Sequence, residues 1–351
     1  MIRSVDVRAV SYPLLHTFVT AAGRKSRTQN VDIRLSLSDG TAGVSEASSS
    51  IAMRRESQPA MIESLRRMIP DVCGRAIGPY RALGAEIWRR HSGHPTAAAA
   101  MECAIVDAYA RTRRRPLWRL FGGAQTSVET DLTLSVASPG TLARRVRSAR
   151  RKGFRKFKVK LAGRRVDEDL ARLRAVAEAA PGARIVADGN QGFNVSKALE
   201  LAARLDSSGI SIVFFEQPFP KQDLAAMRLF RRRSTIPLVA DESVLTPADA
   251  ERLLSGGAAD GVNIKIAKSG LAGALKIIRI ARRLKKMLAI GCMEESKIGL
   301  AASVHLACGT GVFEWIDLDS VFLMKSSRVR GGFTIKGATL SVRGIGPGIG
   351  I

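Results

Sequence analysis

Apolar segments that end in an ionisable residue recur at a nearly constant interval from about residue 128 onward. Successive ends lie 28, 28, 25 and 24 residues apart, and they are Lys160, Asp188, Glu216, Asp241 and Lys265. One strand, its return helix and two short loops occupy about that much chain. Residues 167–179 and 196–207, which lie between these ends, have the apolar spacing of helices. The interval therefore predicts repeated βα units and a parallel sheet.

Eight such units are predicted. The candidate strands are 130–136, 154–161, 184–188, 211–216, 236–241, 260–265, 287–292 and 313–317. Eight parallel units of this size close into a (β/α)8-type barrel, in which the residues that carry the chemistry lie at the C-terminal ends of the strands. The predicted fold class is therefore α/β, and the ionisable ends are predicted to share one barrel mouth.

The first 115 residues have a different pattern and are predicted to form an α+β capping domain. Residues 2–12 and 30–46 alternate between apolar and polar side chains, as antiparallel strands do. Between them, residues 17–27 form a basic loop of small residues that could close over a bound group. Helical spacing follows at 55–72, 78–92 and 96–113.

The remaining chain divides into the barrel and a C-terminal segment. We assign the barrel to residues 116–325 and the segment to residues 326–351. Residues 332–342 alternate again, so the segment is expected to return to the capping domain and pair with its strands.

The charge of the chain is strongly basic. It has 56 Lys and Arg residues against 31 Asp and Glu residues, a formal net charge of +25. Such a balance is compatible with nucleic-acid binding, but the basic runs are scattered along helical stretches, and aromatic residues that could stack on bases make up 5%. Solvated helix faces are the simpler interpretation, so we expect no nucleic-acid partner.

The sequence also supports expectations about compartment and partners. No segment is long and apolar enough to span a membrane, and the first residues lack the pattern of a secretory signal. The four cysteines lie far apart in apolar surroundings, without the spacing of metal ligands. We therefore expect a cytoplasmic homo-oligomer that acts on a small molecule and has no membrane partner.

Three acidic residues end consecutive predicted strands: Asp188, Glu216 and Asp241. Their carboxylates are predicted to converge at the barrel mouth within reach of one ion. Three oxygen ligands without His or Cys favour Mg2+, with Mn2+ as the alternative. Acids after barrel strands can also simply cap the next helix, but three in succession between lysines are better explained by a metal site.

Lysines flank this acidic trio on both sides. Lys158 and Lys160 lie on one face of the strand-like run 156–160. Because a buried lysine needs an anion nearby, the face that carries them is expected to lie against the acids. Strands two and six of a closed eight-strand barrel are diametrically opposed, so Lys160 and Lys265 are predicted to face each other across a substrate. That arrangement suits moving a proton from one face of a carbon atom to the other.

These motifs together resemble the muconate-lactonizing-enzyme subgroup of the enolase superfamily, over nearly the whole chain. The matching stretches are Lys158-Val159-Lys160, Asp188-Gly189-Asn190-Gln191, Glu216-Gln217-Pro218, Asp241-Glu242-Ser243 and Asn263-Ile264-Lys265. Two further stretches, Gly291 to Ser296 and Asp317-Leu318-Asp319, resemble the dipeptide epimerases of that subgroup.

The resemblance implies Mg2+-dependent epimerisation of a dipeptide at the α-carbon of its second residue. Lys160 and Lys265 would transfer protons on opposite faces of a metal-stabilised enediolate, and the substrate carboxylate would bind the metal and Lys158. Asp317 and Asp319 would hold the α-ammonium group, since two anions suit one cation. L-Ala-D/L-Glu is the leading substrate by resemblance, followed by dipeptides with a hydrophobic or cationic second residue.

Further side chains are assigned around these residues. Asn190 and Glu242 are expected to support the metal ligands from behind. Substrate contacts are expected from Thr133, Ser135, Met293, Glu294 and Arg24. An acid at position 294 favours a cationic or neutral second residue, whereas the basic loop favours an acidic one, and a third interpretation is that Glu294 pairs with that loop.

Other activities remain open at this point. An N-acylamino-acid racemase or an o-succinylbenzoate synthase of the same subgroup would share the lysines and the metal. Their substrates offer no ammonium group to Asp317 and Asp319. A basic nucleic-acid-binding protein built on the barrel would explain the charge, but it would leave the acids at the mouth without a role.

Overall fold

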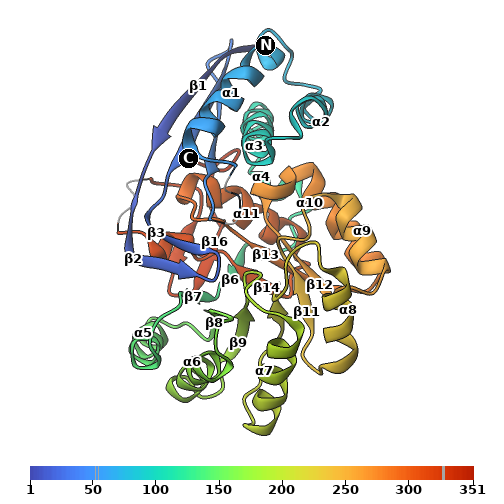
Figure 1. Ribbon diagram of the computed structural model, residues 1–351. Coiled ribbons are helices and arrows are strands. Elements are labelled where there is room, and N and C mark those ends of the chain that lie inside the picture. Colours follow the sequence, from blue (N-terminus) through green and yellow to red (C-terminus); the bar gives the residue numbers. More distant parts are fainter. Residues whose placement is uncertain (52, 54, 326–328) are drawn as a thin grey trace.

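The computed structural model describes residues 1–51, 53, 55–325 and 329–351. Figure 1 shows a sheet-and-helix unit at the N-terminal end of the chain, which lies against a barrel of alternating strands and helices. This arrangement confirms the predicted α/β fold class with a separate N-terminal unit. Among the described residues, no helix combines the length and the apolar character needed to cross a bilayer.

The N-terminal unit is an antiparallel sheet covered by three helices. Its strands lie in the order β1 (Ile2–Val10), β4 (Asn30–Leu37) and β5 (Ala42–Ser48). Every second residue of β4 from Val31 to Leu37 is buried, and these side chains pack in one core with the helices. The helices are α1 (Gln58–Val72), α2 (Tyr80–His91) and α3 (Pro95–Thr112).

The predicted basic loop is a β-hairpin. Strand β2 (Pro13–Thr20) pairs antiparallel with β3 (Gly23–Arg27), and Phe18 lies opposite Lys25. Most of its residues are exposed or half-buried, so its sequence lacks the apolar alternation by which a half-buried strand is recognised. The Val136 backbone N–H donates a hydrogen bond of 3.0 Å to the Val19 carbonyl, which ties the hairpin to the barrel.

The barrel contains all eight predicted strands. They form one sheet of parallel neighbours in sequence order. Two hydrogen bonds join the first strand to the last. The Asp131 N–H donates to the Ile316 carbonyl, and the Leu318 N–H donates to Thr130 Oγ1. The strands are β7 (Leu132–Leu134), β8 (Lys156–Lys160), β9 (Arg184–Asp188), β10 (Phe215–Glu216), β11 (Leu238–Ala240), β12 (Gly261–Ile264), β13 (Met287–Gly291) and β14 (Trp315–Asp317).

Helices cover the outside of the barrel. Their apolar faces and the outward side chains of the strands form one large core. Two short helices precede the first barrel strand and follow the last one in the chain, and they are α4 (Leu117–Leu120) and α12 (Ser320–Leu323). The longer ones are α5 (Pro139–Arg151), α6 (Val166–Ala179), α7 (Val195–Ser207), α8 (Leu224–Arg233), α9 (Pro247–Ser255), α10 (Ile266–Arg283) and α11 (Lys297–Thr310).

An apolar layer inside the barrel forms the floor of the site. Val186, Phe214, Val239 and Trp315 belong to one buried cluster. Each of them lies two positions before an acidic strand end, and side chains two apart on a strand point the same way. The alternation of the sequence therefore places Asp188, Glu216, Asp241 and Asp317 in the layer directly above this floor.

The C-terminal segment differs from the prediction. Its strands β15 (Thr334–Lys336) and β16 (Thr339–Ser341) form a sheet with β6 (Ser127–Glu129), which precedes the barrel, and not with the N-terminal sheet. Alternation identifies a strand but does not specify its partner. The last residues do reach the N-terminal unit, where Ile349 N–H donates to Asp107 on α3. Residues 326–328 of the predicted segment lie outside the described residues.

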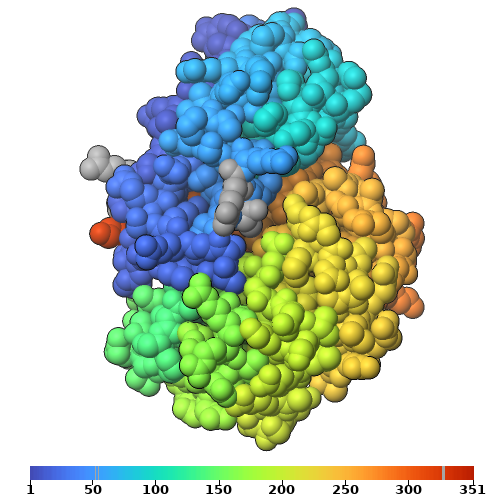
Figure 2. Space-filling model, viewed as in Figure 1, coloured from blue at the N-terminus to red at the C-terminus, as the bar shows by residue number. Residues whose placement is uncertain are grey.

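The two parts of the molecule are in direct contact. Figure 2 shows the blue N-terminal chain packed against the green and yellow residues of the barrel. Asn30, on β4, donates to Glu46 Oε1 and to the Glu294 carbonyl, both at 2.9 Å. Glu46 also accepts from the Ser296 N–H at 2.7 Å. The capping unit is therefore bonded to the loop that follows β13.

Candidate active site

Lys158 lies at the centre of a buried cluster of carboxylates. Its Nζ is 2.8 Å from Glu216 Oε1, 2.8 Å from Asp317 Oδ2 and 3.0 Å from Asp188 Oδ2. Burial opposes the positive charge, but Asp317 and Glu216 raise the pKa of Lys158 well above its usual value. Lys158 is thus held as an ammonium group, while Lys160 Nζ, two residues on, lies 2.6 Å from Asp188 Oδ2.

A second lysine pair lies on the β12 side of the barrel. Lys265 Nζ is 2.7 Å from Asp241 Oδ2, and Lys268 Nζ is 2.6 Å from Asp241 Oδ1. Lys268 also donates to the backbone carbonyls of Asp241 and Asn263. Although burial opposes ionisation, Lys265 and Lys268 lower the pKa of Asp241. Lys268 was not among the predicted site residues, and its spacing of three residues from Lys265 was the available signal.

Lys160 and Lys265 face one pocket from opposite walls. Strand β8 carries Lys160, and Lys265 directly follows β12, four strands further round the eight-stranded sheet. Both side chains line the same pocket. Half of an eight-stranded ring separates them, which is the arrangement that the spacing of the sequence predicts.

The three predicted metal ligands do not approach one another as closely as expected. Lys158 lies between Asp188 and Glu216, and Asp241 is paired with lysines on the other side. Carboxylates in an interior attract any nearby cation, which explains this pairing. Burial opposes the charge of Asp188, but Lys160 and Lys158 lower its pKa to about 2, whereas burial raises the pKa of Glu216 to about 7.

Oxygen atoms beside these acids lack partners, which fits a hard cation. Asn190 Nδ2 donates to Glu242 Oε1 at 3.4 Å. Three further buried oxygen atoms there accept no hydrogen bond, namely Asn190 Oδ1, Glu242 Oε2 and Asn263 Oδ1. Buried oxygen acceptors without donors are costly, and a donor set made only of oxygen is the preference of Mg2+.

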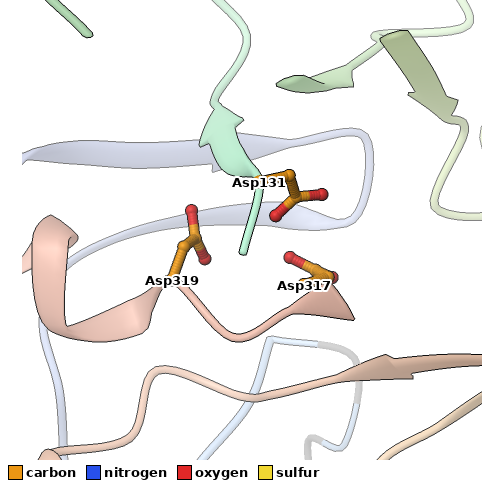
Figure 3. Close-up of side chains that lie close together, drawn as sticks. All are labelled: Asp131, Asp317 and Asp319. Carbon is orange, nitrogen blue, oxygen red and sulfur yellow. The ribbon is translucent and has the colours of Figure 1, made fainter. Parts of the chain in front are cut away.

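Asp317, Asp319 and Asp131 form a second acidic group, which shares Asp317 with the cluster around Lys158. Among the described residues it is the set of three acidic side chains whose oxygen atoms lie within 4.8 Å of one another. Figure 3 shows the carboxylates of Asp131 and Asp317 turned toward each other, with Asp319 beside them. Thr133 binds two members, because its N–H donates to Asp319 Oδ2 and its hydroxyl to Asp317 Oδ1 at 3.3 Å.

The third acid, Asp131, was not found from the sequence. It lies just before β7, and its Oδ2 accepts from Trp315 Nε1 at 2.6 Å while Oδ1 is buried without a donor. Burial and the charges of Asp317 and Asp319 raise its pKa well above the usual range. Burial and Asp317 also raise the pKa of Asp319 to about 7. A cationic group in this place would relieve the repulsion among the three acids.

The pocket has walls from both parts of the chain. Phe18, Thr20 and Ala22 of the hairpin and Ser50 and Ile51 of the capping unit lie opposite the barrel residues. Most of the predicted site residues line this pocket, and they are Lys158, Lys160, Asn190, Asp241, Glu242, Lys265, Met293, Glu294, Asp317, Asp319 and Thr133. Asp188 and Glu216 are almost fully buried.

Two predicted substrate contacts lie elsewhere. Arg24 is exposed, and the hairpin residue that reaches the site is its neighbour Lys25, whose Nζ is 2.6 Å from Glu294 Oε2. Neighbouring residues of a strand point to opposite sides, so only one of the two can face the barrel. Ser135 lines an adjoining cavity, where it accepts from Arg145 at 3.4 Å. Of the three interpretations of Glu294, this ion pair supports the one in which it pairs with the basic loop.

Comparison with known proteins decides the family. Residues 2–122 match the N-terminal domain of mandelate racemase and muconate lactonizing enzyme, and residues 141–351 match the enolase C-terminal domain-like family. The chain belongs to the mandelate racemase and muconate lactonizing enzyme family. The resemblance inferred from the motifs is thereby confirmed, and this family member is an isomerase of the racemase and epimerase type.

Individual relatives align with nearly the whole chain. It is 36% identical to the aromatic dipeptide epimerase of Herpetosiphon aurantiacus over 97% of its own length and 96% of that protein. The substrate-liganded L-Ala-D/L-Glu epimerase of Bacillus subtilis superposes with a TM-score of 0.96 at 30% identity, over 100% and 98% of the two chains. A dipeptide epimerase of Enterococcus faecalis V583, complexed with Mg and L-Leu-L-Tyr, gives 0.94 at 28% identity, over 99% of each.

Proposed function

We propose that this chain is a Mg2+-dependent dipeptide epimerase that inverts the α-carbon of the second residue. The observation that carries the proposal is the pocket itself, which is lined by Lys160 and Lys265, from strands half a ring apart, and by Asp317 and Asp319. A proton can leave one face of a carbon atom and return on the other only if an acid and a base face both sides of it. The family relatives that are named dipeptide epimerases support the same substrate class.

The side chains divide the work as follows. Asp317 and Asp319 bind the α-ammonium group of the first residue, and Lys158 binds the carboxylate of the second. Binding at both ends orients the substrate so that the α-hydrogen of the second residue points toward one of the two lysines, Lys160 or Lys265. That lysine accepts the proton from the α-carbon, and the other donates a proton to the opposite face. Lys160 and Lys265 exchange these roles when the reaction runs from the other epimer.

Asp188, Glu216 and Asp241 would hold the metal ion, with Asn190 and Glu242 behind them. When bound, Mg2+ supplies positive charge beside the substrate carboxylate and so stabilises the negative charge that develops as the α-proton leaves. Mn2+ shares this preference for oxygen donors and is the alternative. Lys160 is paired with Asp188 and Lys265 with Asp241, so a metal ion held by these two carboxylates would leave both lysines available for proton transfer.

The second residue of the substrate is best fitted by an apolar side chain. Lys25 is engaged by Glu294 at 2.6 Å and by the Ser49 carbonyl at 2.9 Å. Lys25 itself does not line the pocket, and the cations among the described lining residues are Lys158, Lys160 and Lys265. Ile51 and Met293 add apolar surface. A Glu, the first candidate by resemblance, requires Lys25 to leave Glu294, and a cationic residue requires Glu294 to leave Lys25.

A dipeptide library in D2O tests the proposal. Dipeptides that differ in the second residue are incubated with enzyme and Mg2+, and deuterium uptake at each α-carbon is read by mass spectrometry and NMR. We expect uptake with inversion at the second residue and none at the first. Preferential exchange of N-acylamino acids, which lack the ammonium group, would instead favour an N-acylamino-acid racemase.

A further inference from the structure

A second cavity adjoins the catalytic pocket at the end where the ammonium group is proposed to bind. It lies among β2, β7, α5 and α12, and we call it the side cavity. Phe18, Thr133 and Leu323 line both the side cavity and the catalytic pocket. The side cavity has a volume of about 210 Å3 and is partly open to solvent. A substrate group that extends from the ammonium site past Phe18 therefore enters it.

The polar side of the side cavity is basic. His16, Arg145 and Lys152 line it, and none of its described lining residues is acidic. Arg145 is half-buried and donates to Ser135 Oγ at 3.4 Å, and no described acidic side chain forms an ion pair with it. Burial and the charge of Arg145 lower the pKa of His16, so His16 is mainly neutral near neutral pH. Arg145 then carries the positive charge on this side of the side cavity. The remaining wall, which includes Leu14, Leu132 and Phe322, is largely apolar.

The direction of β7 connects the ammonium site to Arg145. Thr133 contacts both Asp317 and Asp319, and Ser135, two residues further on, contacts Arg145. Two residues of extended chain advance about 6.6 Å. A glutamate spans about 5 Å from its α-nitrogen to its side-chain carboxyl carbon by standard bond lengths. With a hydrogen bond at each end, a first-residue glutamate can therefore reach from the ammonium site at Asp317 and Asp319 to the guanidinium group of Arg145.

We propose that this chain selects dipeptides whose first residue is acidic, with Glu the best fit, and that Arg145 is the residue that selects it. The inference rests on the proposed dipeptide epimerase function and names the first residue of its substrate. The apolar wall packs against the methylene groups, and Arg145 binds the carboxylate at their end. Charge-assisted hydrogen bonds of this kind are about twice as strong as neutral ones.

Three dipeptides with the same second residue test the selection. The probes are L-Glu-L-Leu, L-Gln-L-Leu and L-Ala-L-Leu, and the readout is kcat/KM for deuterium uptake at the leucine α-carbon with the Mg2+-loaded enzyme. Gln has the shape of Glu without its charge, so the ratio of the two isolates the contribution of Arg145. We expect L-Glu-L-Leu to exceed L-Gln-L-Leu by about tenfold or more, the usual size of a hydrogen bond to a charged group.

Variants of α5 assign the preference to one residue. Arg145→Met is expected to bring the Glu to Gln ratio close to one and to leave L-Ala-L-Leu unchanged, and Arg145→Lys to retain part of the preference. Arg144→Met is the matched control, because Arg144 is exposed and its side chain donates to Thr141 on the same helix. It is expected to keep the ratio of the unmodified enzyme.

Each outcome bears on the inference. Equal use of L-Glu-L-Leu and L-Gln-L-Leu overturns it, and so does a preference that survives in Arg145→Met. Either result leaves the epimerase function standing, provided that L-Ala-L-Leu exchanges at the leucine. Absence of exchange with every dipeptide overturns the proposed function, and this inference with it.

Discussion

Replacing Asp319 by Asn isolates the proposed recognition of the ammonium group. Asp317 is the less informative choice, because its Oδ2 is also 2.8 Å from Lys158 Nζ, and its loss would leave that buried ammonium short of a partner. Asp319 accepts instead from the Thr133 N–H, and the amide oxygen of an Asn side chain can still accept this bond. The substitution therefore removes one charge with little change of shape.

The size of the effect follows from the lost charge. A hydrogen bond to a charged group contributes about 1.5–3 kcal/mol, which corresponds to a fall of roughly 10- to 150-fold in kcat/KM. The fall should apply to dipeptides alone. An N-acylamino acid has no ammonium group, so any activity toward it should be unaffected by Asp319→Asn.

The same residue predicts the pH dependence. Burial and Asp317 raise the pKa of Asp319 to about 7, so its charged form is present above this pH and is lost as the pH falls through it. Since the charged form binds the ammonium group, kcat/KM for dipeptides should rise as the pH increases through about 7. The amide introduced by Asp319→Asn does not titrate, so this limb of the profile should be missing in the variant.

The assay is deuterium uptake at the second residue over a pH range that brackets the pKa of Asp319, with Asp131→Asn as the matched variant. Burial and the neighbouring acids raise the pKa of Asp131, which favours its protonated form, and Asn has the shape of a protonated Asp. We expect Asp131→Asn to have a much smaller effect than Asp319→Asn. An equal loss for dipeptides and N-acylamino acids in Asp319→Asn, or no loss at all, would refute the assignment.

Three further outcomes are expected. Lys160→Ala and Lys265→Ala should each abolish epimerisation, yet one enantiomer should still exchange its α-hydrogen with D2O in each; full epimerisation in either variant contradicts the two-lysine assignment. Removing divalent cations with EDTA should abolish activity, and added Mg2+ should restore it; activity that survives dialysis against EDTA argues against a metal. Burial raises the pKa of Glu46 from 4.5 to about 8, so between these pH values the folded state should keep the Glu46 proton and the melting temperature should fall as the pH rises. Glu46→Gln should reduce this fall. If the variant shows the same change of melting temperature with pH, Glu46 is not its source.

The barrel and its chemical residues were accessible from the sequence because their signals are local. The interval from Asp188 to Glu216 to Asp241 reflects the length of one βα unit. Alternation within each strand fixes which side chains face inward, and this placed Lys158 on the face that lies against the acids. The roles of the three acids as metal ligands and of the lysines in catalysis remain predictions.

Contacts between distant segments were less accessible. The sequence indicated that Glu294 could pair with the basic loop, but not that Lys25 would be the partner or that the loop is a hairpin. No local signal indicated that Asp131 lies with Asp317 and Asp319. The partner of β16 was assigned to the wrong sheet.

The sequence by itself determined the number of βα units, the face of each strand that carries charge, and the strand end at which that charge lies. These follow from the length of a repeat and the two-residue period of a strand, which are properties of neighbouring residues. The tertiary structure decided which side chains meet, such as Arg145 with Ser135 and Lys25 with Glu294. Such pairs depend on how separate elements pack, and no local pattern records that packing.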